Sequence, residues 1–295
     1  MRRLFALLAA LSLSAQAAPS ALIPPEPLEL VGIAPDAAPG QPGAPVTGVL
    51  AVRAYGGSTV KLYDAATARQ RREVLLPPEV VLTVPPALSP DGKWLAVALT
   101  PDPDTREGRV GILSTFPVFP PAFRVVLKSE GLRGSRNFAF SPDGTRLAVG
   151  NRDGYVQLWD WQAGQRLNTV KSTIDPDWLS FSPDGRFFTP HFRGQTATQL
   201  LDGHTGAPVN TLRGVGYGMF TPDGHFIASG GRYLSLPSGE KVTSPAYLKG
   251  GVTVQGYSRD GKRVLVQLPT PASTPRPHLT FARGRRWANA GPPHP

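Results

Sequence analysis

Short apolar runs of four to seven residues, separated by turns rich in Gly, Pro, Asp and Ser, make up most of the chain. Beyond the first twenty residues, no window keeps the i, i+3, i+4, i+7 apolar spacing of an amphipathic helix. The chain contains 32 Gly and 33 Pro among 295 residues, and helix breakers at that density leave little room for long helices. The pattern therefore predicts an all-β protein.

One run recurs together with its turn. Residues 138–150 read FAFSPDGTRLAVG, and close variants lie at 88–98, 181–189, 220–230 and 257–266. Ser-Pro-Asp-Gly suits a tight turn, because Pro presets φ at the second position and Gly supplies a positive φ at the fourth. Leu147, Ala148 and Val149 are consecutively apolar, so both faces of the returning strand are predicted to be buried. The unit is thus a β-hairpin in a sheet covered on both sides.

The Asp-Gly pairs of these turns are predicted to be structural rather than catalytic: Asp91, Gly92, Asp143, Gly144, Asp184, Gly185, Asp223, Gly224, Asp260 and Gly261. A second repeated segment with two further strands follows the hairpin, as at 154–170, 196–212 and 58–76. The turn aspartates lie 52, 41, 39 and 37 residues apart, and about 40 residues in four antiparallel strands is one blade of a β-propeller. One blade cannot cover either of its own faces, whereas blades stacked around a ring cover one another.

The Ser-Pro-Asp-Gly turns and the pair Trp159-Asp160 resemble those of bacterial WD40-like β-propellers, including YVTN and TolB-type repeats. The resemblance is strongest over residues 80–267, and Tyr63-Asp64 and Leu201-Asp202 are looser forms of the Trp-Asp pair. It implies a ring with a central channel and loops on two flat faces that suit the binding of partner proteins.

Six blades are expected, with seven as the alternative. The expected organisation is a signal peptide at 1–17, a linker at 18–27, a propeller at 28–287 and a flexible tail at 288–295. Within the propeller we expect a degenerate first blade at 28–79, clear blades at 80–248 and a last blade at 249–287. Either residues 283–287 form the outer strand of the last blade, or residues 28–33 cross over to supply it.

The first residues predict export. Met1-Arg2-Arg3 is a basic start, Leu4 to Ser14 is apolar, and Ala15-Gln16-Ala17 offers small side chains to a signal peptidase. Since the apolar run is well short of the roughly 20 residues that span a bilayer, a cleaved secretory signal is favoured over an anchor. No later stretch approaches that length, so a soluble periplasmic or secreted protein is expected. With no cysteine, disulfides, thiol nucleophiles and cysteine-linked lipid are excluded.

The formal charge of +10 permits weak binding to anionic polymers. The basic residues are spread along the chain and do not alternate with aromatic residues as in single-strand nucleic-acid binders. A basic surface that keeps the protein in solution is the favoured interpretation.

No catalytic residue, metal site or cofactor is predicted. His191, His204, His225, His278 and His294 lack the spacing of a zinc site. Asp102, Asp104 and Glu107 could belong to a calcium loop, but they lack its twelve-residue ligand order, so a solvated hairpin tip is favoured.

The expected function is a non-enzymatic protein-binding or scaffold module of the cell envelope, with an unidentified protein partner. Its irregular loops at 34–45, 100–109 and 269–277 are the expected binding elements. One alternative is a lactonase-like propeller hydrolase with a metal in the channel, for which Asn137 and Asp177 are the candidate polar groups near the axis. The other is a basic module attached to an anionic envelope polymer.

Overall fold

The structure is a computed structural model, and it describes residues 28–35, 48–54, 56–65, 67–116, 122–192, 194–215, 218–221, 224–228, 232–244, 253–257, 263–267 and 285–289. Several predictions fall outside these ranges: the signal peptide, the linker, most of loop 34–45, loop 269–277, His278, His294, Asp223, Asp260 and Gly261. They stay predictions.

The described residues form six antiparallel sheets in chain order. The first two are β1 (Leu28–Pro35), β2 (Gly48–Ala54), β3 (Thr59–Asp64) and β4 (Gln70–Leu75), then β5 (Ala87–Leu88), β6 (Trp94–Leu99), β7 (Gly108–Ser114) and β8 (Phe123–Ser129). The third and fourth are β9 (Ser135–Phe140), β10 (Arg146–Asn151), β11 (Tyr155–Asp160) and β12 (Gln165–Lys171), then β13 (Pro176–Phe181), β14 (Phe187–Phe192), β15 (Ala197–Asp202) and β16 (Pro208–Arg213).

The last two sheets have three strands each. They are β17 (Gly218–Phe220), β18 (Phe226–Ala228) and β19 (Arg232–Leu234), then β20 (Thr253–Tyr257), β21 (Arg263–Gln267) and β22 (Arg285–Asn289). A bridge between Leu234 and Lys241 extends the fifth sheet outward. The only helix among the described residues is the 3-10 turn η1 (Glu130–Leu132), and none of their helices has the length and hydropathy to cross a membrane.

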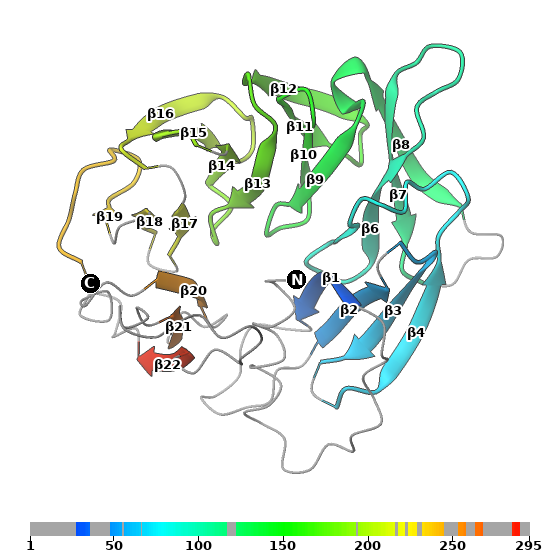
Figure 1. Cartoon of the computed structure of the whole chain (residues 1–295), viewed down its shortest axis with the longest axis horizontal. Helices are drawn as coiled ribbons and strands as arrows, with labels where there is room; N and C mark the ends of the chain where they lie inside the picture. Colours follow the sequence, from blue (N-terminus) through cyan, green and yellow to red (C-terminus); the bar gives the residue numbers. More distant parts are fainter. Residues whose placement is uncertain are drawn as a thin grey trace, which may run out of the picture.

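The sheets are arranged around a common axis, with the first strand of each innermost (Figure 1). Neighbouring innermost strands are in contact, β1 with β5, β5 with β9, β9 with β13 and β13 with β17. This arrangement is a β-propeller, as the sequence predicts. The number of blades in the complete ring, six or seven, stays a prediction.

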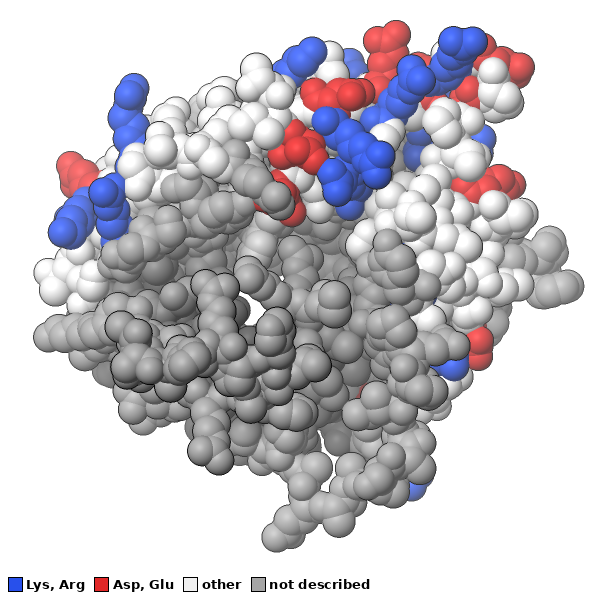
Figure 2. Space-filling model, viewed as in Figure 1, with Lys and Arg blue, Asp and Glu red and all other residues white. Residues whose placement is uncertain are grey.

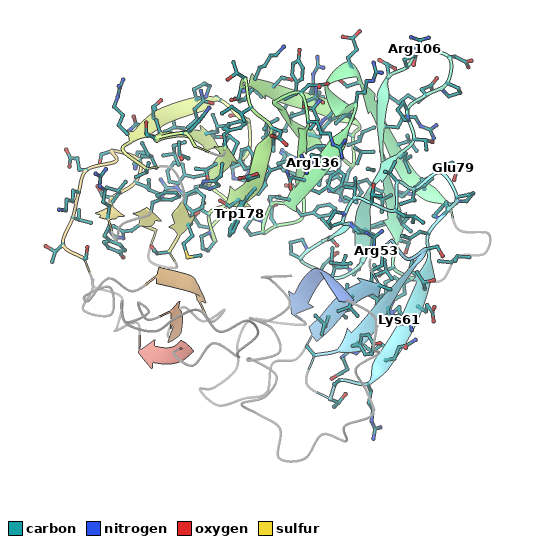
Figure 3. The ribbon with its side chains drawn as sticks, viewed as in Figure 1. Arg53, Lys61, Glu79, Arg106, Arg136 and Trp178 are labelled. Carbon is teal, nitrogen blue, oxygen red and sulfur yellow. The ribbon has the colours of Figure 1, made fainter. Side chains whose placement is uncertain are left out.

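The hydrophobic core lies between adjacent sheets, where side chains fill the spaces (Figure 3). Leu147, Ala148 and Val149 of β10 are all 0% exposed, so both faces of this strand are buried, as predicted. Ile112 and Leu127 of the second sheet pack in one cluster with Leu147 of the third. Each sheet thus depends on its neighbours to cover its apolar faces.

The pairing of the third and fourth strands has one extra residue at the same register in four sheets. These bulge residues are Arg71, Arg124, Leu167 and Val209. The residues that follow them, Arg72, Val125, Asn168 and Asn210, therefore occupy equivalent positions on the outer strands.

At the two ends of the propeller, each terminal strand pairs within its own sheet. β1 pairs with β2, and β22 pairs with β21 as the outer strand of the last sheet. The mode of ring closure stays a prediction. β22 ends at Asn289, where Ala288 and Asn289 pair with Val264 and Arg263.

Candidate functional site

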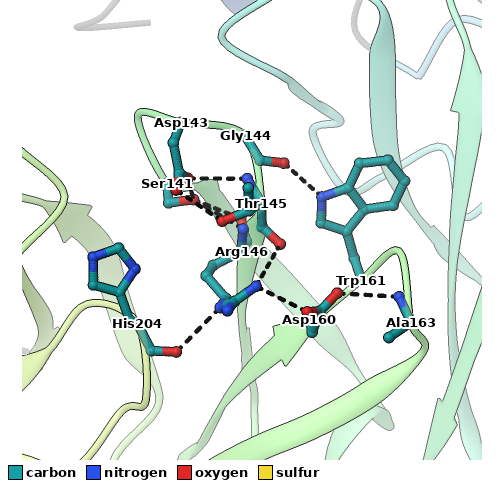
Figure 4. Close-up of polar contacts among 9 residues, drawn as sticks. All are labelled: Ser141, Asp143, Gly144, Thr145, Arg146, Asp160, Trp161, Ala163 and His204. Atoms are coloured by element: carbon teal, nitrogen blue, oxygen red, sulfur yellow. Dashed lines mark hydrogen bonds and ion pairs between the residues drawn. The ribbon is translucent and has the colours of Figure 1, made fainter.

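The Ser-Pro-Asp-Gly turn between β9 and β10 is closed by hydrogen bonds among its own residues (Figure 4). The Ser141 hydroxyl donates to the Asp143 carboxylate and accepts from the Arg146 backbone N–H at 2.9 Å. Asp143 also accepts the backbone N–H of Thr145 at 3.0 Å. Gly144 has a φ of 73°, in the left-handed region where a side chain is strained. The carboxylate therefore satisfies donors of the turn itself.

Three other sheets repeat this turn. Ser89 and Ser182 donate to Asp91 and Asp184, and Thr221 accepts the backbone N–H of His225 at 2.9 Å. The turn glycines all have positive φ, at 70° for Gly92, 73° for Gly144, 75° for Gly185 and 80° for Gly224. The hydroxyl residue that opens the turn is buried in each: Ser89, Ser141, Ser182 and Thr221.

The same contacts set the pKa of Asp143. Burial alone would raise the pKa of this carboxyl, but hydrogen bonds from Ser141 and Thr145 outweigh burial and lower its pKa below the ordinary value. Asp143 is therefore held ionised by groups of its own turn. A carboxylate in that state is a poor general acid at neutral pH.

The turns of adjacent sheets lie against one another. A Cβ on Gly144 would lie 4.0 Å from Cδ of Pro90, and a Cβ on Gly185 would lie 3.7 Å from Cδ of Pro142. Each turn contributes one aspartate to its own sheet, so these carboxylates do not gather at one point. Among the described residues, no group of three or more His, Cys, Asp or Glu side chains could hold a metal ion.

The aspartates that end the third strands cap the next turn. Asp160 accepts the backbone N–H of Ala163 at 3.1 Å, and its other oxygen accepts from the Arg146 guanidinium at 2.9 Å. Asp64 and Asp202 accept the equivalent N–H groups of Thr67 and Thr205. These aspartates have the same role in all three sheets. The residue that precedes the aspartate differs, however: it is Trp159 in one sheet, and Tyr63 and Leu201 in the other two.

The pKa values of the Asp64 and Asp202 carboxyls are both lowered. A hydrogen bond from Arg71 is the largest cause for Asp64, whose pKa lies well below the usual range. For Asp202, burial would raise the pKa, but the donors of Thr205 and His204 outweigh it. Their charge is therefore used to fix the β3–β4 and β15–β16 turns.

The acidic loop 100–109 between β6 and β7 is folded around Asp102. This carboxylate accepts the backbone N–H groups of Asp104 at 3.1 Å and Thr105 at 3.2 Å, and Lys128 Nζ lies 3.1 Å from its second oxygen. The hydrogen bond from the Thr105 backbone N–H is the largest cause, followed by the one from the Lys128 side chain, and together they lower the pKa of Asp102 to about 2. Both oxygens of Asp102 thus accept hydrogen bonds from donors of this loop and of β8.

Acidic and basic side chains lie side by side over this loop at the edge of the molecule (Figure 2), where Arg106 projects outward (Figure 3). Asp104 and Arg106 are exposed, whereas Glu107 is half-buried.

The polar residues expected near the axis differ in their surroundings. The Asn137 side-chain amide donates to the backbone oxygen of Pro176, and Arg136 forms an ion pair with Asp175. These contacts join β9 to the segment that begins β13. Asp177 is half-buried in β13. Asn137 therefore links β9 to Pro176, the residue that precedes Asp177 in β13.

The sequence does not predict one polar cluster, which lies around His191. His191 is 1% exposed, and its Nε2 lies 2.9 Å from Thr189 Oγ1 and 3.3 Å from Ser180 Oγ. Its ring stacks on Phe226 of the next sheet with 6.2 Å between centroids. A lone histidine in the string FTPHF gives no spacing that predicts this contact. The other two described histidines lie in or beside turns, His204 exposed and His225 half-buried against Tyr233.

Repeated four-stranded sheets around an axis, joined by self-capped turns, define a repeat protein of the β-propeller class. The sequence profile of the WD40 family (WD domain, G-beta repeat) matches residues 134–160 and 195–233. An uncharacterized WD repeat-containing protein of Synechocystis sp. is 30% identical over 115 residues, which cover 37% of this chain and 29% of that relative. This chain thus matches less than a third of the length of that relative. The chain thus contains WD40-like repeats over the matched residues, in agreement with the resemblance of its Ser-Pro-Asp-Gly and Trp-Asp motifs.

Proposed function

We propose that this β-propeller is exported and acts as a non-enzymatic protein-binding or scaffold module of the cell envelope. The observation behind the proposal is that the repeated carboxylates hydrogen-bond to their own turns, as Asp143 does to Ser141 and Thr145. WD40 repeats suggest a protein-interaction surface, and here the exposed loops supply the variable part of it.

Loop 100–109 is the best described candidate for that surface. Asp102 caps its backbone and pairs with Lys128 of β8, so the loop is ordered before any partner binds. A preformed loop loses little conformational entropy on binding. Its exposed tip presents both a carboxylate, Asp104, and a guanidinium, Arg106.

Charge reversal at one residue before β6 and at one residue in the loop after it tests the role of this loop. Arg106→Glu changes the loop, whereas Lys93→Glu makes the same charge change in the turn that precedes β6. The mature protein is coupled to a resin and incubated with envelope extract, and bound proteins are identified by mass spectrometry. We expect a saturable partner whose capture is weakened by Arg106→Glu and unaffected by Lys93→Glu. Absence of any saturable protein partner would contradict the proposed function.

Export is tested separately by expressing the full chain and a form lacking residues 2–17 in a bacterium. We expect the full chain to give a shortened protein outside the cytoplasm with Ala18 at its N-terminus, because the first seventeen residues match a secretory signal. The truncated form should stay in the cytoplasm. Retention of the uncleaved full chain in the cytoplasm would remove the envelope from the proposal.

A further inference from the structure

Three of the outer strands contact the next sheet through the residue that follows the bulge. The Asn168 side-chain amide donates to the backbone oxygen of Gly206 in the β15–β16 turn. Asn210 does the same to the backbone oxygens of Pro237 and Ser238, both at 2.8 Å. The Arg72 guanidinium lies 4.3 Å from the centroid of the Phe116 ring, which follows β7. In these places a side chain closes the junction between adjacent sheets.

The equivalent residue between the second and third sheets is Val125, which has neither the length nor the polar group for such a contact. A cavity of about 160 Å³ lies there, lined by Trp94, Arg124, Val125, Trp161 and Gln162.

The turn glycines give independent evidence that this junction is open. A Cβ on Gly206 would lie 2.7 Å from Cβ of Asn168, and a Cβ on Gly239 would lie 2.9 Å from Cδ2 of Leu212. A Cβ on Gly164, the matching glycine of the third sheet, would have nothing within 4 Å apart from its own chain neighbours. The outer strand of the second sheet therefore leaves the β11–β12 turn uncovered at Gly164, although Gln157 and Arg166 of the third sheet donate hydrogen bonds to Ser129 at the end of β8.

The walls of the cavity favour a compact apolar group. The centroids of the Trp94 and Trp161 rings are 5.5 Å apart and their planes are inclined by 57°, so the two rings form a corner rather than a flat platform. Trp161 is 2% exposed, so the half-buried Trp94 supplies the accessible ring surface of this corner. An aliphatic or aromatic side chain would fill such a corner with favourable burial of its apolar surface.

Charge at the rim favours a carboxylate beside that apolar group. Arg124, the exposed bulge residue of β8, forms no ion pair within the part of the chain that the structure describes. Gln162 at the same rim is exposed and offers both a donor and an acceptor. The formal charge of the chain, +10, also favours an acidic ligand.

We propose that this cavity docks an acidic peptide segment of a partner protein, with one apolar side chain against the half-buried Trp94 ring, beside its contact with Trp161, and a neighbouring carboxylate on Arg124. The proposal rests on the proposed function, since it assigns the protein partner a docking point. Val125 is the residue that leaves the site open.

Binding is tested with a fluorescein-labelled peptide, Gly-Asp-Phe-Glu-Gly, followed by anisotropy on the mature protein. Two further peptides, Gly-Asp-Ala-Glu-Gly and Gly-Lys-Phe-Lys-Gly, separate the apolar from the acidic contribution. We expect saturable binding of the first peptide and at least about tenfold weaker binding of the other two. An oligogalacturonate is the competing probe, because it has carboxylates without an apolar side chain.

Val125→Arg places at this junction the residue type found at the equivalent Arg72 position. We expect it to keep the fold and to weaken peptide binding at least about tenfold, because the cavity is filled. Arg124→Gln should weaken binding about threefold to fivefold, as expected for one exposed ion pair. Arg213→Gln removes an equally exposed charge from β16 and should have no effect. Since Arg124 is at the surface, its variant tests the site even if Val125→Arg does not fold.

No saturable binding of the acidic peptide, or equal binding by folded Val125→Arg, overturns the site. Preferential binding of the oligogalacturonate overturns the assignment to a peptide. If envelope capture succeeds while Val125→Arg has no influence on capture or peptide binding, the proposed function stands and this site does not. Peptide binding without any envelope partner would instead count against the proposed function alone.

Discussion

The indole Nε1 of Trp161 donates a 2.8 Å hydrogen bond to the backbone oxygen of Gly144 (Figure 4). This bond joins the β11–β12 turn to the β9–β10 turn of the same sheet. The Trp161 ring also lies edge-on to Phe140 and against Trp94 of the preceding sheet. One side chain thus fixes two turns and the boundary with the neighbouring sheet.

Trp161→Phe removes this hydrogen bond and keeps most of the ring. We expect the free energy of unfolding to fall by about 1 kcal/mol, because the Gly144 oxygen loses its donor. Trp161→Ala also leaves a cavity and should cost about 3–5 kcal/mol. Urea unfolding followed by circular dichroism measures both. If Trp161→Phe were as stable as the parent protein, the bond would contribute nothing to the junction of the two turns.

Gly144→Val should destabilise the protein more than Lys93→Val. A β-branched residue is strained at the Gly144 φ of 73°, at a cost of roughly 1–3 kcal/mol, although Pro90 leaves room for a Cβ. Lys93 is exposed and follows the equivalent turn, so its replacement should change stability little. Denaturation midpoints of the two variants give the comparison, and equal midpoints would show that the conformation of Gly144 is not a constraint.

Acid should destabilise the propeller through the turn aspartates. Because the folded-state pKa of Asp143 lies below its ordinary value, its contribution is complete above that value and is lost as pH falls through the folded-state pKa. Stability should therefore begin to decrease below about pH 5 and fall further as Asp143 is protonated. Asp143→Asn should be less stable than the parent protein at pH 7 and show a shallower acid dependence.

Asp153→Asn is the control for this prediction, because Asp153 is exposed in the turn between β10 and β11. It should leave the acid dependence unchanged. A pH profile of Asp143→Asn that coincides with that of the parent protein would assign the acid dependence to other groups.

Chelation is expected to change neither stability nor peptide binding, because the repeated carboxylates accept hydrogen bonds from their own turns. The thermal midpoint and peptide anisotropy are measured before and after dialysis against EDTA, and hydrolysis of lactone and ester substrates is assayed in parallel. A lowered midpoint, or hydrolysis that stops on chelation, would instead favour the lactonase-like alternative.

Local chemistry explains why the sequence predicts the fold so directly. The Ser141 hydrogen bonds reach no further than Arg146, five residues away, so every group that forms the turn is present in one short string. The consecutive apolar residues of β10 likewise indicate a strand buried on both faces. Repetition of both signals at the length of a blade then requires stacked sheets, because no sheet can cover its own faces.

Contacts between sheets could be found only in the tertiary structure. The residues that form them are distant in sequence, and the pairing register of the strands decides which of them meet. Trp94 and Trp161 are 67 residues apart and meet only when the second and third sheets stack. Val125 is an ordinary strand residue by sequence, and only the bulge register makes it the counterpart of Asn168. The repeats thus determined the ring, whereas stacking decided which junctions a side chain closes and which one stays open.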